Sequence, residues 1–237
     1  MPKKENIHEL FNDISPDYDR LNHILSLNID KIWRKRSVRE IIDTDHPLEI
    51  LDIACGTGDF SLAIAGKMPE GSHIEGLDLS EGMLAIMKDK ICKANLSEKI
   101  GVRQGDCENL PFNDESFDRI SVAFGIRNFE NREACLKEML RVLKPGGKLV
   151  ILELSLPKNK FVRWLFNIYF LNLLPLIGGR VSGDKAAYRY LPASVLNFPQ
   201  KNEFKAILSS CGYANVTHKA FTCGICRLYS GMKIHNR

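Results

Sequence analysis

The chain has 237 residues, enough for one α/β domain with a buried core and modest additions, but not for two large domains. Its 44% hydrophobic content excludes a disordered chain. The net charge is +4, and the Lys and Arg residues are scattered rather than gathered in a stripe that could follow a nucleic-acid backbone. We therefore expect a globular protein that does not bind nucleic acid.

The cysteines and the first residues bear on the compartment. Seven cysteines without a framework spacing are typical of a reducing environment, and residues 1–9 lack the apolar core of a signal peptide. We expect a cytoplasmic protein. Cys223 and Cys226 form a CxxC, but no second pair or histidine cluster would complete a zinc site, so we interpret them as small residues near a C-terminal strand. The six histidines are far apart, and no metal site is expected.

The first 46 residues have the apolar spacing of helices. Apolar side chains recur at steps of three and four residues, and a second such run covers residues 32–42. The members of the first run are Leu10, Phe11, Ile14, Tyr18, Leu21 and Leu25. The pattern predicts an N-terminal helical cap over residues 1–46, followed by the main domain over 47–237.

From Leu48 onward, short apolar runs alternate with amphipathic stretches, which is typical of an α/β, doubly wound, mostly parallel sheet. The predicted strands are 49–53, 73–77, 100–104, 117–123 and 148–154, and the predicted helices are 59–66, 82–94 and 132–142. A turn is expected at Lys144-Pro145-Gly146-Gly147.

After residue 154 the alternation stops. Helices are expected over 161–176, 191–197 and 200–211, the first two within a helical lid at about 157–199. Strands over 213–221 and 225–232 would add an antiparallel edge and complete a seven-stranded sheet. The apolar run 161–176 is interrupted by Arg163, Asn167, Asn172 and Pro175 and falls short of the ~20 residues of a membrane span. Two readings stay open for it, a lid buried on a substrate pocket and a surface that meets lipid.

The loop after the first strand has the composition of a nucleoside site. Gly56 and Gly58 let the backbone turn tightly and approach a ligand, and Ala54 fills the first small position. Asp78, twenty residues past Gly58, would accept hydrogen bonds from the ribose hydroxyls. The loop lacks the third glycine of a dinucleotide site, and Asp59 follows it. A ligand with a sulfonium and an ammonium suits that charge better than one with phosphates, so a nicotinamide dehydrogenase is disfavoured.

Two later segments complete the pattern. Asp106 follows the third strand and either reaches the adenine amino group or caps a turn, and both readings stay open. Together with residues 52–59, Asp78, Cys107 and 143–147, it resembles the motif series of class I S-adenosylmethionine methyltransferases. The segments 18–22, 124–128, 188–191 and 198–199 further resemble the ubiquinone/menaquinone biosynthesis C-methyltransferase family, over nearly the whole chain.

This resemblance implies S-adenosylmethionine as cofactor and a lipid-tailed quinol as substrate. The implied reaction places a methyl group on the ring carbon of reduced demethylmenaquinone, the final step of menaquinone biosynthesis. Cofactor contacts are expected from Ala54, Gly56, Thr57, Asp78, Asp106 and Cys107. Two positions depart from the family, which often has Ser where Ala123 stands and His-Arg where Asp30 and Lys31 stand.

Three residues are candidates for the chemistry. Arg127 would stabilise the phenolate formed from the quinol, since its own pKa is too high for a base. A water polarised by Tyr18 or Asp19 would take the proton. The competing reading of Arg127 is a surface salt bridge.

The prenyl tail implies peripheral contact with the inner face of the cell membrane. Oligomeric state stays open, a homodimer included. The competing functions are methylation of a benzoquinol, a sterol or another phenol, and cofactor binding without catalysis.

Overall fold

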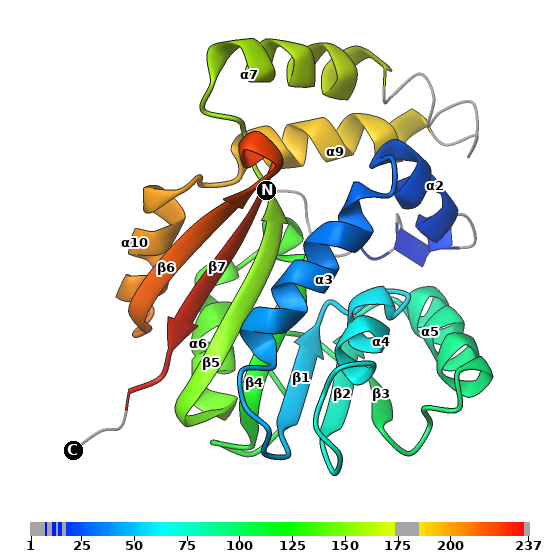
Figure 1. Ribbon diagram of the computed structural model, residues 1–237, viewed down its shortest axis with the longest axis vertical. Coiled ribbons are helices and arrows are strands. Elements are labelled where there is room, and N and C mark those ends of the chain that lie inside the picture. The colour runs from blue at the N-terminus through cyan, green and yellow to red at the C-terminus, as the bar shows by residue number, and fades with distance from the viewer. Residues whose placement is uncertain (1–7, 9–10, 13, 16–17, 174–184, 235–237) are drawn as a thin grey trace.

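One seven-stranded sheet organises the molecule (Figure 1). The computed structural model describes residues 8, 11–12, 14–15, 18–173 and 185–234. The strand order is β3-β2-β1-β4-β5-β7-β6. The strands are β1 (Glu49–Ile53), β2 (His73–Asp78), β3 (Ile100–Gln104), β4 (Phe117–Ala123), β5 (Leu143–Leu154), β6 (Ala214–Phe221) and β7 (Cys226–Met232). The first five pair in parallel, and β7 runs antiparallel to both β5 and β6. The predicted mostly parallel fold with an antiparallel edge is confirmed.

Helices cover both faces of the sheet (Figure 1). One face packs against α3 (Ile29–Ile41), α4 (Asp59–Ala65) and α5 (Glu81–Lys93), and the other against α6 (Arg132–Val142) and α10 (Asn202–Ser210). Because both faces are covered, β1 is buried from its second residue onward, which explains its continuous apolar run. The carboxyl ends of the parallel strands therefore meet at one edge, where such folds place their ligands.

Of the N-terminal helices, α2 (Tyr18–Leu25) lies near that edge and α3 runs from it along one face of the sheet (Figure 1). α2 and α3 follow each other closely, and Leu10 of the predicted apolar run lies outside the described residues. Trp33 and Val38 of α3 share one core with Ile50 of β1 and Leu152 of β5. A helix of the predicted cap is thus packed directly on the sheet, and the division at residue 46 stays a prediction.

The expected turn at 144–147 is wrong, because these residues belong to β5. Leu143 already pairs with Phe117, and the register shifts between Phe117 and Arg119. Gly146 has a φ of 78°, and its N–H donates to the carbonyl of Lys233 at 2.8 Å. The strand continues through the Pro-Gly-Gly sequence, where its pairing with β4 is irregular, instead of ending there.

The insertion after β5 also differs from its expected bounds. In place of one helix over 161–176, α7 (Lys160–Asn167) passes into the π-helical η3 (Ile168–Leu173), and residues 174–176 lie outside the described residues. α9 (Lys185–Asn197) begins six residues earlier than expected and continues through Pro192. Pro192 therefore lies in the interior of the helix, although a proline is usually tolerated only in the first turn.

Candidate functional site

The glycine loop after β1 is built for close backbone approach. Ala54, Gly56 and Gly58 have φ angles of 53°, 56° and 84°. A Cβ at Gly58 would lie 2.6 Å from the Cγ of Met87 on α5, so a larger residue is excluded by both conformation and contact. The packing of Gly58 against Met87 brings the start of α4 into contact with α5 and fixes the conformation of the predicted glycine loop.

A cavity opens beside this loop; we call it the cofactor cavity. Ala54, Gly56, Asp78, Asp106 and Cys107 all line it, as the sequence predicted for a shared ligand site. Its apolar walls come from Phe11, Leu77, Leu79, Met83, Phe124 and Phe129. Apolar, partly aromatic walls and the half-buried carboxylate of Asp78 suit the adenine and ribose of a nucleoside.

Asp78 is held in this cavity by backbone donors. Its Oδ2 accepts the N–H of Gly56 at 2.8 Å, and its Oδ1 accepts the N–H of Ser80 at 2.9 Å. Burial raises the pKa of the Asp78 carboxyl, while these backbone hydrogen bonds oppose the rise. Each oxygen keeps acceptor capacity for a ribose hydroxyl, so the residues present fit the cofactor that the motifs imply.

Asn12 is a site residue that the sequence did not reveal. Its Oδ1 accepts from Ser80 Oγ at 2.5 Å and from the N–H of Gly82 at 3.2 Å, and its Nδ2 lies 3.2 Å from His8 Nε2. His8 lines the cofactor cavity. His8 and Phe11 thus line the cavity with Asp78, and Asn12 ties them to Ser80 and Gly82, a contact across about 70 residues that no local pattern signals.

A second cavity is also lined by residues of this loop; we call it the acceptor cavity. Its apolar lining comes from Trp33, Leu154, Phe166, Tyr169, Phe170, Leu191 and Ile225. Phe166 and Phe170 stack with their ring centroids 4.6 Å apart. Tyr18, Ala54, Gly56, Ala123 and Phe124 line both cavities, so the two meet at these five residues.

Arg127 stands in the wall of the acceptor cavity and is buried, with 8% of its surface exposed. Its Nη1 lies 2.8 Å from Glu153 Oε1 and also donates to the carbonyl of Phe124, and its Nε donates to Ser194 Oγ at 3.2 Å. Glu153 has no exposed surface. The surface reading of the Arg127 ion pair is therefore wrong, because three elements hold this guanidinium inside the molecule.

Tyr18 lies where the two cavities meet, and Asp19 points elsewhere. Burial raises the pKa of the Tyr18 hydroxyl, against the opposing charge of Arg127, so Tyr18 is a neutral hydrogen-bond donor at neutral pH. Asp19 pairs with Lys90 at 2.5 Å and accepts from Thr57 Oγ1 at 2.5 Å. Thr57 lines the acceptor cavity rather than the cofactor cavity. The hydrogen bond from Thr57 to Asp19 joins the glycine loop to the N-terminal cap.

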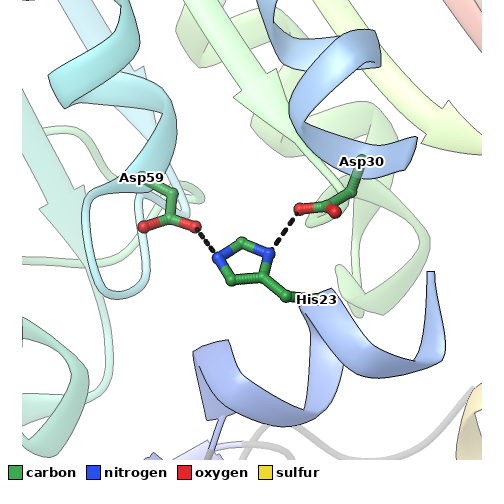
Figure 2. A group of neighbouring side chains, drawn as sticks. All are labelled: His23, Asp30 and Asp59. Carbon is green, nitrogen blue, oxygen red and sulfur yellow. Dashed lines mark hydrogen bonds and ion pairs between the residues drawn. The ribbon is translucent and has the colours of Figure 1, made fainter. Parts of the chain in front are cut away.

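His23, Asp30 and Asp59 gather beside the acceptor cavity (Figure 2). His23 Nδ1 lies 2.9 Å from Asp30 Oδ2, and its Nε2 lies 3.4 Å from Asp59 Oδ2. Arg34 pairs with Asp30, and Lys90 lies 2.6 Å from Asp59 Oδ1. Because two cations already compensate both carboxylates, we interpret the group as an ion-pair network between cap and core. The spacing of these three residues in the sequence did not predict that they lie together.

Two of the segments that carry the family resemblance, 124–128 and 188–191, contact each other in the structure. Tyr190 of α9 donates its hydroxyl to Asn128 Oδ1 at 2.9 Å, and Ser194 of α9 contacts Arg127. The segment 124–128 is thus held by the helix that carries the segment 188–191. Both segments contribute to the lining of the acceptor cavity, through Arg127 and Leu191.

Comparison with known proteins assigns the family. The model of the ubiE/COQ5 methyltransferase family matches residues 1–233. The chain belongs to the ubiE/COQ5 methyltransferase family. It is 45% identical over 231 residues to the ubiquinone/menaquinone biosynthesis C-methyltransferase UbiE of Geobacter sulfurreducens, covering 98% of this chain and 90% of that protein. Against the demethylmenaquinone methyltransferase of Bacteroides fragilis it is 42% identical over 231 residues, covering 98% and 94%.

Solved structures agree on the fold. A putative S-adenosyl-L-methionine-dependent methyltransferase from Methanococcus maripaludis has a TM-score of 0.66 at 21% identity, covering 100% of this chain and 97% of that one. The [4+2]-cyclase SpnF has a TM-score of 0.74 at 15% identity, covering 99% and 97%. A cyclase on this fold shows that architecture alone does not fix the reaction. Family membership does: the protein is a methyltransferase that uses S-adenosylmethionine.

Proposed function

We propose that this methyltransferase places a methyl group on the ring carbon of reduced demethylmenaquinone, giving menaquinol in the final step of menaquinone biosynthesis. One observation carries the proposal. The acceptor cavity is lined by aromatic and aliphatic side chains, meets the cofactor cavity at Tyr18 and Phe124, and has the buried Arg127 in its wall. A flat, apolar, oxygen-bearing ring with a prenyl tail matches that lining.

The protein's main task is orientation. When bound, S-adenosylmethionine supplies an already activated methyl group on a sulfonium. Ala54, Gly56, Asp78, Asp106 and Cys107 would hold it on the cofactor side. The acceptor ring would then lie against Phe124 in the second cavity, and fixing two reactants in line can contribute roughly 7–11 kcal/mol. Residues of α2, α3 and α7 line the second cavity and would limit the access of bulk water to the ring.

Arg127 and Tyr18 would act on the quinol oxygens. A quinol that has lost a hydroxyl proton pushes electron density onto the neighbouring ring carbon, and a fixed guanidinium stabilises that phenolate. Tyr18, neutral at the junction of the cavities, can donate a hydrogen bond to the same oxygen or to a water. We propose that a water in the open part of the cavity takes the hydroxyl proton and passes it to the solvent. The methylated ring carbon then loses its own hydrogen as a proton, which restores the aromatic ring. Asp19 contributes by fixing α2 to Thr57 and Lys90.

We further propose that the enzyme works in the cytoplasm, peripherally at the inner face of the membrane that holds its substrate. Among the residues that the structure describes, no helix has the length and apolarity needed to cross a bilayer. A quinol with a polyprenyl tail resides in lipid, and its ring must reach the acceptor cavity from there. α7 and η3, which line that cavity through Phe166 and Phe170, are the nearest route.

The test is transfer of labelled methyl from S-adenosylmethionine to reduced demethylmenaquinone, run in parallel with a demethylated benzoquinol and a simple phenol. The proposal expects product from the naphthoquinol. Product from both quinols would make the enzyme serve two quinone pathways. Product from the phenol alone, or none from any acceptor while calorimetry shows the cofactor bound, would refute the proposal.

A further inference from the structure

α7 shows different chemistry on its two sides. Phe166, like Phe170 in the following turn, is buried against the acceptor cavity. The other side carries Phe161, Trp164 and Leu165, which are 66%, 58% and 47% exposed, and η3 adds the exposed Ile168. These four are among nine large apolar side chains exposed in the described part of the chain, so the exposed apolar surface is concentrated on this element.

The two aromatic rings of this outer side form a pair. Phe161 and Trp164 stack with centroids 6.1 Å apart and an angle of 27° between their planes. Gathered apolar side chains on a surface mark an interaction site, and Trp is typical of the level where a membrane meets water. In Figure 1, α7 lies at the end of the molecule beyond the sheet, well separated from α5.

Basic side chains flank the aromatic pair. Lys158, Lys160 and Arg163 are exposed, and none forms an ion pair with another residue of the described ranges. Burial and the charges of Arg227, Arg163 and Lys158 lower the pKa of Lys201. A Cβ at Gly224 would lie 3.5 Å from Arg227 Nη2 and 3.9 Å from the backbone N of Lys158, so Arg227 lies beside the start of this basic segment. The acid near them, Glu203, accepts instead from the N–H of Gln200 at 3.3 Å.

Arg227 adds a buried positive charge to the same group. It is 6% exposed, its Nη1 lies 3.0 Å from His218 Nδ1, and its buried Nε has no hydrogen-bond partner within the described structure. Its partner across the β5–β7 ladder is Glu153, whose Oε1 pairs with Arg127 instead, and Arg227 forms no ion pair with a carboxylate of the described residues. Arg227 thus adds positive charge behind the exposed Lys158, Lys160 and Arg163, and this excess of positive charge favours an anionic partner.

We propose that the outer side of α7 and its basic flank form a docking surface for an anionic phospholipid bilayer. Phe161 and Trp164 enter the headgroup level, and Lys158, Lys160, Arg163 and Lys201 contact lipid phosphates. Because the inner side of the same helix lines the acceptor cavity, docking would bring the cavity to the lipid. That last consequence rests on the proposed function, whereas the docking itself does not.

Vesicle binding tests the docking directly. Purified protein is mixed with phosphatidylcholine vesicles, with or without phosphatidylglycerol, and followed by sedimentation and by tryptophan emission. Trp33 is 5% exposed and donates to Thr222 Oγ1, so a blue shift reports Trp164. We expect binding and a blue shift with the anionic vesicles, weakened by added salt. Equal binding to neutral vesicles, or no binding to either kind, would overturn the proposal.

Paired charge reversals locate the surface. Lys158→Glu with Arg163→Glu should lower the binding constant for anionic vesicles by about tenfold or more. Lys88→Glu with Lys93→Glu on α5 makes the same change in net charge at exposed positions away from α7 and should change it by less than about twofold. An equal loss in both pairs would mean that overall charge, not this surface, binds lipid.

Two further readouts separate the alternatives. A blue shift that grows with protein concentration in the absence of vesicles would show that a second copy of the chain covers α7, and would contradict lipid docking. Turnover of a soluble naphthoquinol lacking the prenyl chain should be unchanged by Lys158→Glu with Arg163→Glu. If no quinol is methylated at all, the proposed function fails, while phosphatidylglycerol-dependent binding would still support the docking.

Discussion

Arg127 Nη1 lies 2.8 Å from Oε1 of Glu153, a carboxylate with no exposed surface. Glu153 also accepts from the backbone N–H of Arg127 at 3.2 Å and of Leu154 at 2.8 Å. The carboxylate thus fixes both the backbone and the guanidinium of Arg127. In this account Glu153 positions the cation that stabilises the phenolate.

Glu153→Gln should therefore affect both stability and turnover. Removing one partner of a buried ion pair leaves the other uncompensated and costs about 3–5 kcal/mol. We expect that loss in urea unfolding, together with a fall in kcat of about tenfold or more and an unchanged cofactor Kd. Glu138→Gln, which breaks the partly exposed pair with Arg141, is the control and should cost about 1 kcal/mol or less with normal kcat.

Arg127→Ala tests the cation itself. Loss of a fixed donor to a developing oxyanion lowers kcat by about 10²–10³-fold in comparable sites. Titration calorimetry should show that the variant still binds S-adenosylmethionine. Unchanged turnover with intact cofactor affinity would remove Arg127 from the mechanism.

Asp78→Asn should weaken cofactor binding. A hydrogen bond to a charged acceptor contributes about 1.5–3 kcal/mol, so we expect the cofactor Kd to rise about 10–100-fold. Asp114→Asn, at a side chain 72% exposed, is the matched control. A Kd within about twofold of wild type for Asp78→Asn, measured by calorimetry, would show that the cofactor is not held there.

Asp52 makes stability depend on pH. Burial raises the pKa of its carboxyl to about 6, although Ser121 and Ser61 donate to it. The folded state therefore keeps a proton that the unfolded state, with a pKa of 3.8, has lost, and stability falls as pH rises from about 4 to 6. The contribution is on the order of 3 kcal/mol.

Asp52→Asn should remove this contribution. We expect the difference in unfolding free energy between pH 4 and pH 7, from urea titrations, to shift in the variant by about 2–3 kcal/mol toward greater relative stability at pH 7. The same pH difference in wild type and variant would mean that Asp52 is ionised throughout.

Phe166→Ala should weaken binding of the prenyl tail more than binding of the quinol ring. The side chain is 7% exposed and stacks on Phe170 in the lining of the acceptor cavity. We expect KM for a prenylated quinol to rise about tenfold or more, and KM for the tail-less ring to change much less. Equal rises in both KM values would place the ring, not the tail, against Phe166.

The sequence predicted the parts of this site that lie next to one another in the chain. The glycine loop with Asp78 follows from strand, turn and spacing, and the periodicity predicted the sheet. Spacing could not show that Asn12 reaches Ser80, that Glu153 meets Arg127, or that His23 joins Asp30 and Asp59, because these contacts depend on how distant elements pack. Pro192 inside α9 and the strand through Pro145 show tertiary packing overriding local propensity.

The most direct test of the central claim is where the methyl group goes. Wild-type enzyme is incubated with ¹³C-methyl S-adenosylmethionine and reduced demethylmenaquinone, and the product is analysed by NMR. The account predicts that the label lies on the ring carbon next to a hydroxyl-bearing carbon. A label on the quinol oxygen, or an unlabelled quinol despite bound cofactor, would contradict it.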